Sequence, residues 1–209
     1  MEPNYFETRY VPHAGRAIVW KAICEYLQRF VAPTDTVIDI GAGYCDFINQ
    51  ISARVRYAID VNPEAARCCA PGVTFLKVES IEQFDFAAGS VDVAMMSNVL
   101  EHLWPQQCSA LFDRLDHLLT ANGKVIVMQP NYFYAYRRYW DDFTHVRAFS
   151  HESLRDFLLS RGYRMLLFEK RFLPFSFKSR LPASYRLTKL YLASPWKPFA
   201  GQMLAVAQR

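Results

Sequence analysis

The stretch that decides the fold runs from Thr36 to Asp46 and reads TVIDIGAGYCD. Its first five residues form a short apolar, partly β-branched run, which is typical of a buried strand. Gly41-Ala42-Gly43 follow at once, and glycines there let backbone amides approach a ligand. We expect the next helix to begin at this turn. The stretch therefore predicts the strand, turn and helix that open a βαβ unit.

The same alternation of strand and helix recurs along the chain. It implies right-handed crossovers and a mostly parallel sheet, whose ligand lies at the carboxyl ends of the strands. Asn62 with Pro63 predicts the start of a helix, and Asn122-Gly123 predicts the end of one. The expected strands are 36–40, 57–61, 73–78, 91–96, 124–128, 165–168 and 202–207, and the other expected helices are 14–30, 108–119 and 151–160.

Composition predicts one globular domain. The chain has 209 residues, of which 52% are hydrophobic and 21% charged. It contains no run of about 18 uncharged apolar residues, and its start, MEPNYFETRY, lacks the apolar core of a signal peptide. Five cysteines without CxxC spacing, and histidines that do not cluster, indicate neither a disulfide framework nor a zinc site. We expect a cytoplasmic protein with no bound metal.

Charge is distributed unevenly. Residues 1–163 contain 15 Lys/Arg and 19 Asp/Glu, whereas residues 164–209 contain nine Lys/Arg against Glu169 alone. Aromatic residues interleave with these cations, a pattern that suits an anionic membrane surface, nucleic acid or a phosphorylated substrate. A solvated insertion that completes the core explains the pattern equally well. The aromatic residues interleaved with the cations from residue 170 onward are Phe172, Phe175, Phe177, Tyr185, Tyr191, Trp196 and Phe199.

Asp60 ends the second predicted strand, 17 residues after Gly43. A carboxylate there can accept hydrogen bonds from both hydroxyls of a ribose, although Asp-Val-Asn-Pro is also a good turn sequence. In a dinucleotide fingerprint the third glycine would fall at Asp46, whose negative charge would face a pyrophosphate. The pattern therefore favours a nucleoside ligand and disfavours a nicotinamide dehydrogenase.

Four segments in this order, VIDIGAGYCDF, YAIDVNP, GSVDVAMMSNVLEHL and LLTANGKVIVMQPN, resemble the motif set of class I S-adenosylmethionine-dependent methyltransferases. The resemblance covers residues 12–170. It implies an α/β, Rossmann-like fold with a seven-stranded, mostly parallel sheet, the last strand antiparallel, and helices on both faces. It also implies S-adenosyl-L-methionine as the cofactor.

The resemblance further implies cofactor-binding positions. These are Asp39, Gly41, Ala42 and Gly43 around the methionine part, Asp60 and Val61 at the ribose, Ser80 and Ile81 beside adenine, and Asn98 near the sulfonium. Two positions depart from the family pattern. Cys45 replaces a third glycine, which leaves less room at the turn, and Ser80 stands where many relatives carry Asp, which weakens the adenine contact.

His145, His102 and Asp142 are the candidate catalytic residues. His145 lies in YWDDFTHVRAFS, residues 139–150, which resembles a segment of bacterial methyltransferases associated with glycan and polysaccharide biosynthesis. Our hypothesis is that His145, oriented by Asp141 or Asp142, deprotonates a hydroxyl. His102 follows Glu101 just beyond the fourth strand. The alternatives are that His102 packs under the cofactor and that the Asp142 segment only braces a loop.

These expectations describe one methyltransferase domain over 1–209. Its parts are an N-terminal helical cap (1–33), a cofactor-binding core (34–130), an acceptor-side segment (131–163) and a basic aromatic C-terminal region that completes the sheet (164–209). The expected reaction is O-methylation of a sugar hydroxyl on a glycan or a nucleotide- or lipid-linked intermediate. The alternatives are a small-molecule methyltransferase for phenols, quinones or polyketides, and a non-catalytic scaffold that binds the cofactor.

The expected partner is a small-molecule or glycan acceptor. Peripheral contact of residues 164–209 with the anionic inner face of a membrane is an open alternative. Nucleic acid is not expected. The Pro-Pro-Tyr type motif of adenine methylation would follow the fourth strand, where Ser97-Asn98-Val99-Leu100 stand instead.

Overall fold

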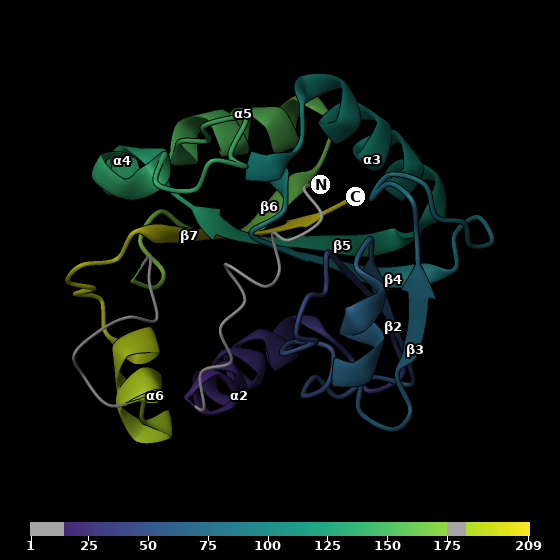
Figure 1. Ribbon diagram of the computed structural model, residues 1–209, viewed down its shortest axis with the longest axis horizontal. Helices are drawn as coiled ribbons and strands as arrows, with labels where there is room; N and C mark the ends of the chain where they lie inside the picture. Colours follow the sequence, from purple (N-terminus) through teal and green to yellow (C-terminus); the bar gives the residue numbers. More distant parts are fainter. Residues whose placement is uncertain (1–14, 175–182) are drawn as a thin grey trace.

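The computed structural model describes residues 15–174 and 183–209, and a seven-stranded sheet runs through the middle of the molecule (Figure 1). The strand order is β3-β2-β1-β4-β5-β7-β6, with parallel pairing from β3 to β5. β7 is antiparallel to both of its neighbours, β5 and β6. The predicted sheet is confirmed. The strands are β1 Thr36–Ile40, β2 Val55–Asp60, β3 Thr74–Lys77, β4 Val91–Ser97, β5 Leu119–Pro130, β6 Arg164–Glu169 and β7 Gln202–Gln208.

Helices cover both faces of this sheet, with α3, α4 and α5 on one side and α2 and α6 on the other (Figure 1). Each face has its own buried cluster, one including Leu111 of α3 and Leu154 of α5, the other Ile23 of α2 and Leu192 of α6. The helices are α2 Arg16–Leu27, α3 Pro105–Leu118, α4 Tyr132–Tyr139, α5 His151–Ser160 and α6 Tyr185–Ala193, and the 3₁₀ turns are η1 Gln28–Phe30, η2 Pro63–Cys68 and η3 Leu100–His102.

The central strand β1 is buried along its whole length because both of its faces are covered. Successive side chains point to opposite faces, so Ile38 and Ile40 pack into one cluster and Val37 into the other. This explains why the strand reads as a continuous apolar run. It also places the glycine turn at the end of a fully buried strand.

Two expected helices have a different structure. The segment after the glycine turn forms successive turns with isolated i→i+4 hydrogen bonds, such as Asn49 N–H to the Cys45 carbonyl (3.0 Å), and no regular helix. Cys45 has φ 57°, which a right-handed helix cannot include. The segment that begins at Pro63 is a 3₁₀ helix, and Asn62 does cap it, accepting a hydrogen bond from the Glu64 N–H (3.1 Å).

The expected stop at Asn122-Gly123 is wrong. α3 ends at Leu118, and β5 begins with Leu119, which pairs with Val91 of β4. Asn122 and Gly123 therefore lie inside the strand, where the Gly123 carbonyl accepts a hydrogen bond from the Arg209 N–H (2.9 Å). Strand pairing with β4 overrides the local helix-ending signal.

α4 and α6 were not among the expected helices. Asn131 begins α4 by accepting a hydrogen bond from the Phe133 N–H (3.2 Å), and Ser184 does the same for α6. α6 is held against α2, where the Tyr185 hydroxyl donates to a Glu25 carboxylate oxygen (2.6 Å). Phe175 and Phe177, two of the aromatic residues of the basic C-terminal region, lie outside the described residues, as do Lys178, Arg180 and His13. Across residues 15–174 and 183–209, no helix is long and apolar enough to cross a membrane.

Candidate functional site

The sheet brings the predicted cofactor residues to one edge. β1 lies between β2 and β4, and β3 lies beside β2, so the carboxyl ends of these four strands meet. Gly41–Gly43 follow β1, Asp60 ends β2, Ser80 and Ile81 follow β3, and Asn98 follows β4. The predicted positions therefore form one surface, as expected for ligand binding at the switch point of a doubly wound sheet.

The glycine turn folds tightly against the end of β2. Gly41 has φ 69°, and its N–H donates to the Ile59 carbonyl (2.8 Å), as does the N–H of Ala42 (3.1 Å). A Cβ on Gly41 would lie 2.6 Å from a methyl group of Val99. Gly41 therefore satisfies two requirements at once, a left-handed backbone and close approach of the segment after β4.

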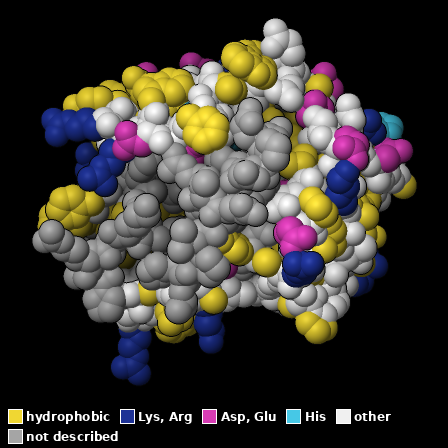
Figure 2. Space-filling model, in the orientation of Figure 1, with side chains coloured by type: hydrophobic (Ala, Val, Ile, Leu, Met, Phe, Trp, Pro, Cys, Tyr) yellow, Lys and Arg dark blue, Asp and Glu magenta, His cyan; other side chains and the backbone are white. Residues whose placement is uncertain are grey.

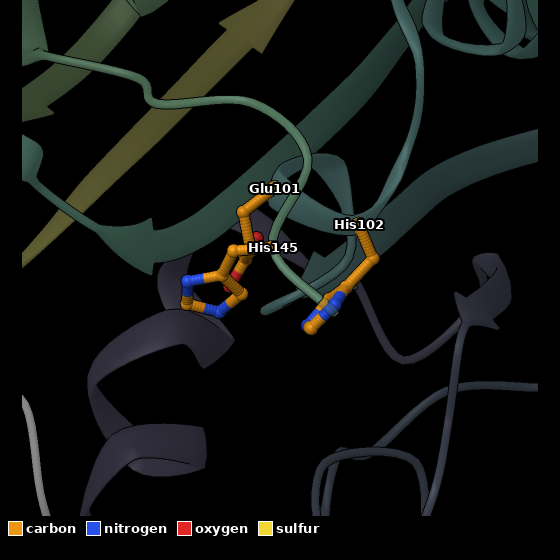
Figure 3. A group of neighbouring side chains, drawn as sticks. All are labelled: Glu101, His102 and His145. Atoms are coloured by element: carbon orange, nitrogen blue, oxygen red, sulfur yellow. The ribbon is translucent and has the colours of Figure 1, made fainter. Parts of the chain in front are cut away.

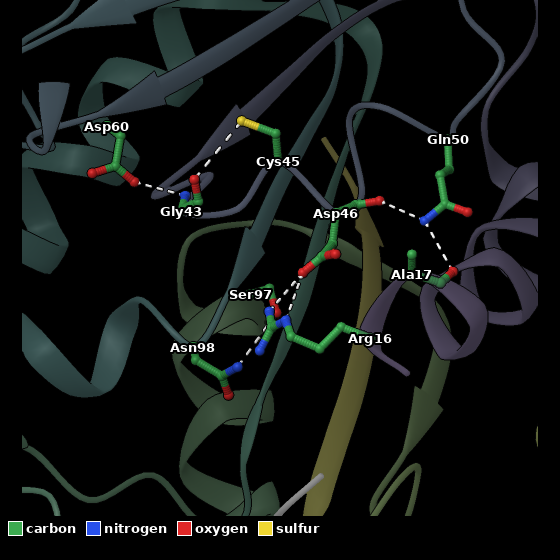
Figure 4. Close-up of polar contacts among 9 residues, drawn as sticks. All are labelled: Arg16, Ala17, Gly43, Cys45, Asp46, Gln50, Asp60, Ser97 and Asn98. Atoms are coloured by element: carbon green, nitrogen blue, oxygen red, sulfur yellow. Dashed lines mark hydrogen bonds and ion pairs between the residues drawn. The ribbon is translucent and has the colours of Figure 1, made fainter. Parts of the chain in front are cut away.

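Asp60 is the buried acceptor of this turn (Figure 4). Its two carboxylate oxygens accept hydrogen bonds from the Gly43 N–H and the Asn62 N–H, each at 2.8 Å. Burial raises the pKa of the Asp60 carboxyl, and these backbone donors partly oppose that rise. Each oxygen keeps a second lone pair, so the carboxylate can still accept hydroxyl groups. Val61, half-buried, packs against the core on the α3 side.

Asp39 lies deeper than Asp60, inside β1, and is 3% exposed. Burial raises its pKa well above the usual range, Asp60 raises it further, and a hydrogen bond from the Ile48 N–H lowers it. Through the hydrogen bond from the Ile48 N–H, Asp39 therefore stabilises the segment after the glycine turn.

Cys45 stands where the family commonly has a third glycine, and its positive φ explains that preference. The residue is buried, with its Sγ 3.4 Å from the Cys69 Sγ, so the side chain is accommodated by the neighbouring η2 segment. Cys45 in place of glycine therefore introduces backbone strain, but the turn keeps its structure.

Arg16 of α2 forms an ion pair with Asp46, directly after Cys45 (Figure 4). Its Nη2 and Nε lie 2.6 and 2.9 Å from one carboxylate oxygen. Burial raises the pKa of Asp46, and Arg16 lowers it. This contact ties the N-terminal helix to the cofactor turn. The sequence analysis missed Arg16, because a single basic residue at the start of a helix carries no distinctive signal.

We predict that Arg16→Ala weakens binding of S-adenosylmethionine about tenfold and costs about 1–3 kcal/mol of stability, because Asp46 is left half-buried without its cation. Calorimetric titration and thermal unfolding measure the two effects. The double variant Arg16→Ala/Asp46→Asn is the matched control, since it removes both charges and should regain most of the lost stability. Unchanged affinity in Arg16→Ala would show that the ion pair does not shape the turn.

Asn98 directly follows β4 and lies in the left-handed region, with φ 54°. Its N–H donates to the Met128 carbonyl (2.8 Å), and its side-chain oxygen accepts from Gln202 Nε2 (3.1 Å). The exposed Asn98 is thus fixed by β5 and β7, and such fixed strain is common at functional sites. Ser80 is half-buried, and Ile81 packs into the core beside α3, which places a polar and an apolar group after β3.

A second group gathers Glu101 and His102 of η3 with His145 of the loop after α4 (Figure 3). One donor atom of each side chain lies within 4.8 Å of the other two. The Glu101 carbonyl accepts hydrogen bonds from the N–H groups of Val146 (2.9 Å) and Arg147 (3.2 Å), which attach the loop to η3. The two predicted histidines therefore belong to one site although they are far apart in sequence.

Main-chain oxygens orient both rings. His145 Nδ1 lies 2.6 Å from the Tyr139 carbonyl oxygen, so this nitrogen carries the proton and Nε2 the lone pair. His102 Nδ1 lies 2.9 Å from Thr144 Oγ1, and that hydroxyl donates to Asp142 (2.7 Å). Asp141 or Asp142 was expected to orient His145, whereas in the structure the Tyr139 carbonyl holds its Nδ1 and Asp142 reaches His102 through Thr144.

Glu101 is the member that the sequence analysis missed. Its side chain is 0% exposed, and within residues 15–174 and 183–209 neither carboxylate oxygen has a hydrogen-bond partner. Burial, and to a smaller degree Asp142, raises the pKa of Glu101 to about 8. Such an orphaned buried carboxyl group is rare in proteins and calls for a partner. In the sequence, only the position of Glu101 next to His102 could have indicated that Glu101 belongs to this group.

The other described histidines lie elsewhere. His117 is exposed on α3, and His151 at the start of α5 has its Nδ1 3.2 Å from Asn131 Nδ2.

The basic region after residue 163 partly completes the core. Phe172 is fully buried, Lys197 pairs with Glu169, and Lys189 pairs with Glu25 of α2 (3.0 Å). These contacts support the interpretation as a core-completing insertion for that part of the region. Among the described residues of this region, large apolar side chains that remain exposed are Leu187, Leu190, Trp196 and Phe199.

Comparison with known families decides the identity. The family model described as "Methyltransferase domain" matches residues 15–167, most of the chain and every predicted cofactor position. The chain belongs to this methyltransferase family. Its reaction is S-adenosylmethionine-dependent methyl transfer, which confirms the enzyme class and the cofactor expected from the motifs. A comparison with curated protein sequences finds no significant match.

Solved structures agree on the fold. A SAM-dependent methyltransferase from Archaeoglobus fulgidus is 17% identical with a TM-score of 0.68, covering 98% of each chain. A possible histamine N-methyltransferase from Thermotoga maritima is 17% identical with a TM-score of 0.69. The match covers 98% of our chain and 94% of the Thermotoga chain. The 1,6-didemethyltoxoflavin-N1-methyltransferase of Burkholderia thailandensis, bound to S-adenosylhomocysteine, is 19% identical with a TM-score of 0.60. The match covers 99% of our chain and 84% of the Burkholderia chain. At these identities the likeness shows the shared fold and not the acceptor.

Proposed function

We propose that this methyltransferase moves the methyl group of S-adenosylmethionine to a hydroxyl group, with a sugar hydroxyl on a glycan or a nucleotide- or lipid-linked intermediate as the preferred acceptor. The observation that carries the proposal is the Glu101–His102–His145 cluster, in which Glu101 and His102 follow β4 just beyond Asn98. The sulfonium is already reactive, so the enzyme must align the acceptor and remove its proton. A cluster of two histidines and a carboxyl group beside the cofactor edge suits that task.

The cofactor roles follow the order of the strands. Asp60 accepts the ribose hydroxyls, and the glycine turn with Asp39 below it holds the methionine part. Ser80 and Ile81 flank the adenine after β3, and Asn98 lies near the sulfonium. Support for this arrangement comes from the common edge that these residues share and from the left-handed backbone at both Gly41 and Asn98.

His145 is the proposed proton acceptor. Its Nδ1–H donates to the Tyr139 carbonyl (2.6 Å), so Nε2 is the ring nitrogen that would accept the proton. The chain from Asp142 through Thr144 to His102 makes Asp142 a positioning residue. The sulfonium gives up its methyl group to the acceptor oxygen, the proton passes to His145, and S-adenosylhomocysteine leaves.

Aromatic and acidic side chains next to this cluster favour a sugar. Tyr136 and Trp140 are each 52% exposed and Phe143 is 66% exposed, so ring faces are presented along α4 and the loop after it. Ring faces stack on the CH groups of sugars, and carboxylates such as Asp141 accept their hydroxyls.

A screen of cofactor consumption tests the acceptor class. The protein is incubated with S-adenosylmethionine and nucleotide sugars, lipid-linked glycans or small phenols, and S-adenosylhomocysteine is measured. Turnover with a sugar hydroxyl supports the proposal, and turnover with phenols alone supports the small-molecule alternative. Cofactor binding without turnover on any hydroxyl would favour a scaffold. Tight NAD binding with no response to S-adenosylmethionine would overturn the assignment as a whole.

We also propose peripheral contact of residues 164–209 with an anionic membrane. Figure 2 shows Lys and Arg side chains projecting beside exposed apolar ones at the end of the molecule where α4 and α6 lie. Leu190, Trp196 and Phe199 are exposed at 68, 76 and 93%, which suits insertion among lipid headgroups. In a flotation assay the protein should rise with anionic vesicles and not with neutral ones. Absence of binding at moderate salt would discard the proposal.

A further inference from the structure

We infer that Glu101, His102 and His145 bind a divalent transition-metal cation. These three side chains come from two segments, η3 and the loop after α4, and their donor atoms lie within 4.8 Å of one another (Figure 3). Ligands of a single cation lie about 3–4 Å apart when each bond is about 2.1 Å long, so small side-chain rotations bring the group into range. The loop is already attached to η3 through the Glu101 carbonyl, which holds the donors in place.

The hydrogen bonds of both rings match those of metal-binding histidines. Such histidines usually donate one ring N–H to a carbonyl or carboxylate and bind the metal through the other nitrogen. His145 Nδ1 lies 2.6 Å from the Tyr139 carbonyl oxygen, and His102 Nδ1 lies 3.2 Å from the Thr144 carbonyl oxygen and 2.9 Å from its hydroxyl. Nε2 is therefore the donor nitrogen in both rings.

Glu101 supplies the observation that points to a ligand. Its carboxylate is fully buried and lies beside the two rings, and in the part of the chain that the structure describes neither of its oxygens has a hydrogen-bond partner. A buried carboxylate without a partner is costly, and a cation held between it and the two imidazoles would supply the missing interaction. The site is thus an incomplete polar cluster that a cation completes.

The donor set selects the kind of cation. Two imidazoles with one carboxylate suit Zn²⁺, Mn²⁺, Fe²⁺ or Co²⁺, whereas Ca²⁺ and Mg²⁺ prefer oxygen ligands throughout. Three protein donors also leave coordination positions for water or substrate, as in catalytic sites. The sequence indicated no metal because the histidines do not cluster along the chain, and this inference departs from that expectation.

The inference rests on the proposed function in one respect, the presence of an acceptor hydroxyl. That oxygen would occupy one of the remaining positions, where the cation lowers its pKa and its proton leaves to solvent. The methyl C–S bond then breaks as the C–O bond forms. In this case His145 would bind the cation, and it would not act as the base.

Metal binding to the tag-free, full-length protein tests the inference. After treatment with chelator, the protein is titrated with Zn²⁺ and with Mn²⁺ by calorimetry, and its thermal unfolding is followed. We expect one cation per chain and a raised Tm. Glu101→Gln and His145→Gln should each weaken binding at least about tenfold. The control His117→Gln, which changes an exposed histidine on α3, should bind as the wild type does.

The outcomes separate this inference from the proposed function. No stoichiometric binding, or equal binding in all three variants, would overturn the inference, and hydroxyl methylation that resists chelator would then leave His145 as base. Specific binding without methylation of any hydroxyl would uphold the metal site and reject the proposed reaction. Methylation that is lost with chelator and restored by the cation would support both.

Discussion

Asp60→Asn should weaken binding of S-adenosylmethionine about 100-fold or more. The substitution keeps the shape of the side chain and removes its charge, and two charge-assisted hydrogen bonds to ribose hydroxyls contribute about 1.5–3 kcal/mol each. The two carboxylate oxygens of Asp60 accept hydrogen bonds from the Gly43 and Asn62 N–H groups, and in asparagine an NH₂ group, which only donates, replaces one of these oxygens. The substitution therefore also disturbs the glycine turn. Calorimetric titration with the cofactor measures the loss.

Asp92→Asn is the matched control for this prediction. Asp92 of β4 also accepts a backbone N–H, that of Thr36 at 2.8 Å, but it lies at the opposite end of the sheet, where β1 begins. Cofactor affinity in Asp92→Asn should match the wild type. If both variants bound the cofactor equally well while Asp60→Asn stayed folded, the ribose role of Asp60 would be wrong.

His145→Ala should lower kcat about 100-fold or more while affinity for S-adenosylmethionine stays within twofold. Loss of a positioned proton acceptor costs about 10²–10⁴ in rate, and loss of a metal ligand at the same place removes the same step. The cofactor residues lie in other segments, so their binding should persist. Steady-state formation of S-adenosylhomocysteine, with separate cofactor titration, measures the split.

His145 is 8% exposed, so the alanine variant could lose rate by unfolding alone. His145→Gln, which retains more of the side-chain volume, and the melting temperature of both variants address this. His151→Ala serves as control because His151 belongs to a different group, beside Asn131. Turnover near the wild-type level in a folded His145→Ala variant would reject the assignment of His145.

Local patterns predicted most of the sheet. β1 and the glycine turn were readable because a buried strand needs a continuous apolar run and because the turn needs residues that tolerate positive φ, as at Gly41 and Gly43. The stop at Asn122-Gly123 failed because pairing of Leu119 with Val91 extends β5 through a sequence that favours a turn. α4 escaped detection because its aromatic residues resemble those of a strand.

The candidate site was predicted only in part. His145 was predicted to be oriented by Asp141 or Asp142, and His102 was chosen separately, whereas the structure connects Asp142 to His102 through Thr144 and holds the loop with His145 against η3. Arg16 was missed because its partner, Asp46, is distant in sequence. Glu101 was missed because burial without a hydrogen-bond partner is a property of the packed molecule.

The sequence by itself determined the βαβ units, the glycine turn after β1 and the acid that ends β2, because backbone conformation and side-chain periodicity are set by neighbouring residues. Only the tertiary structure decided which donors meet. Glu101 and His145 come together because the loop after α4 pairs its N–H groups with η3. That placement depends on how the whole chain packs around the sheet, so no local pattern encodes it.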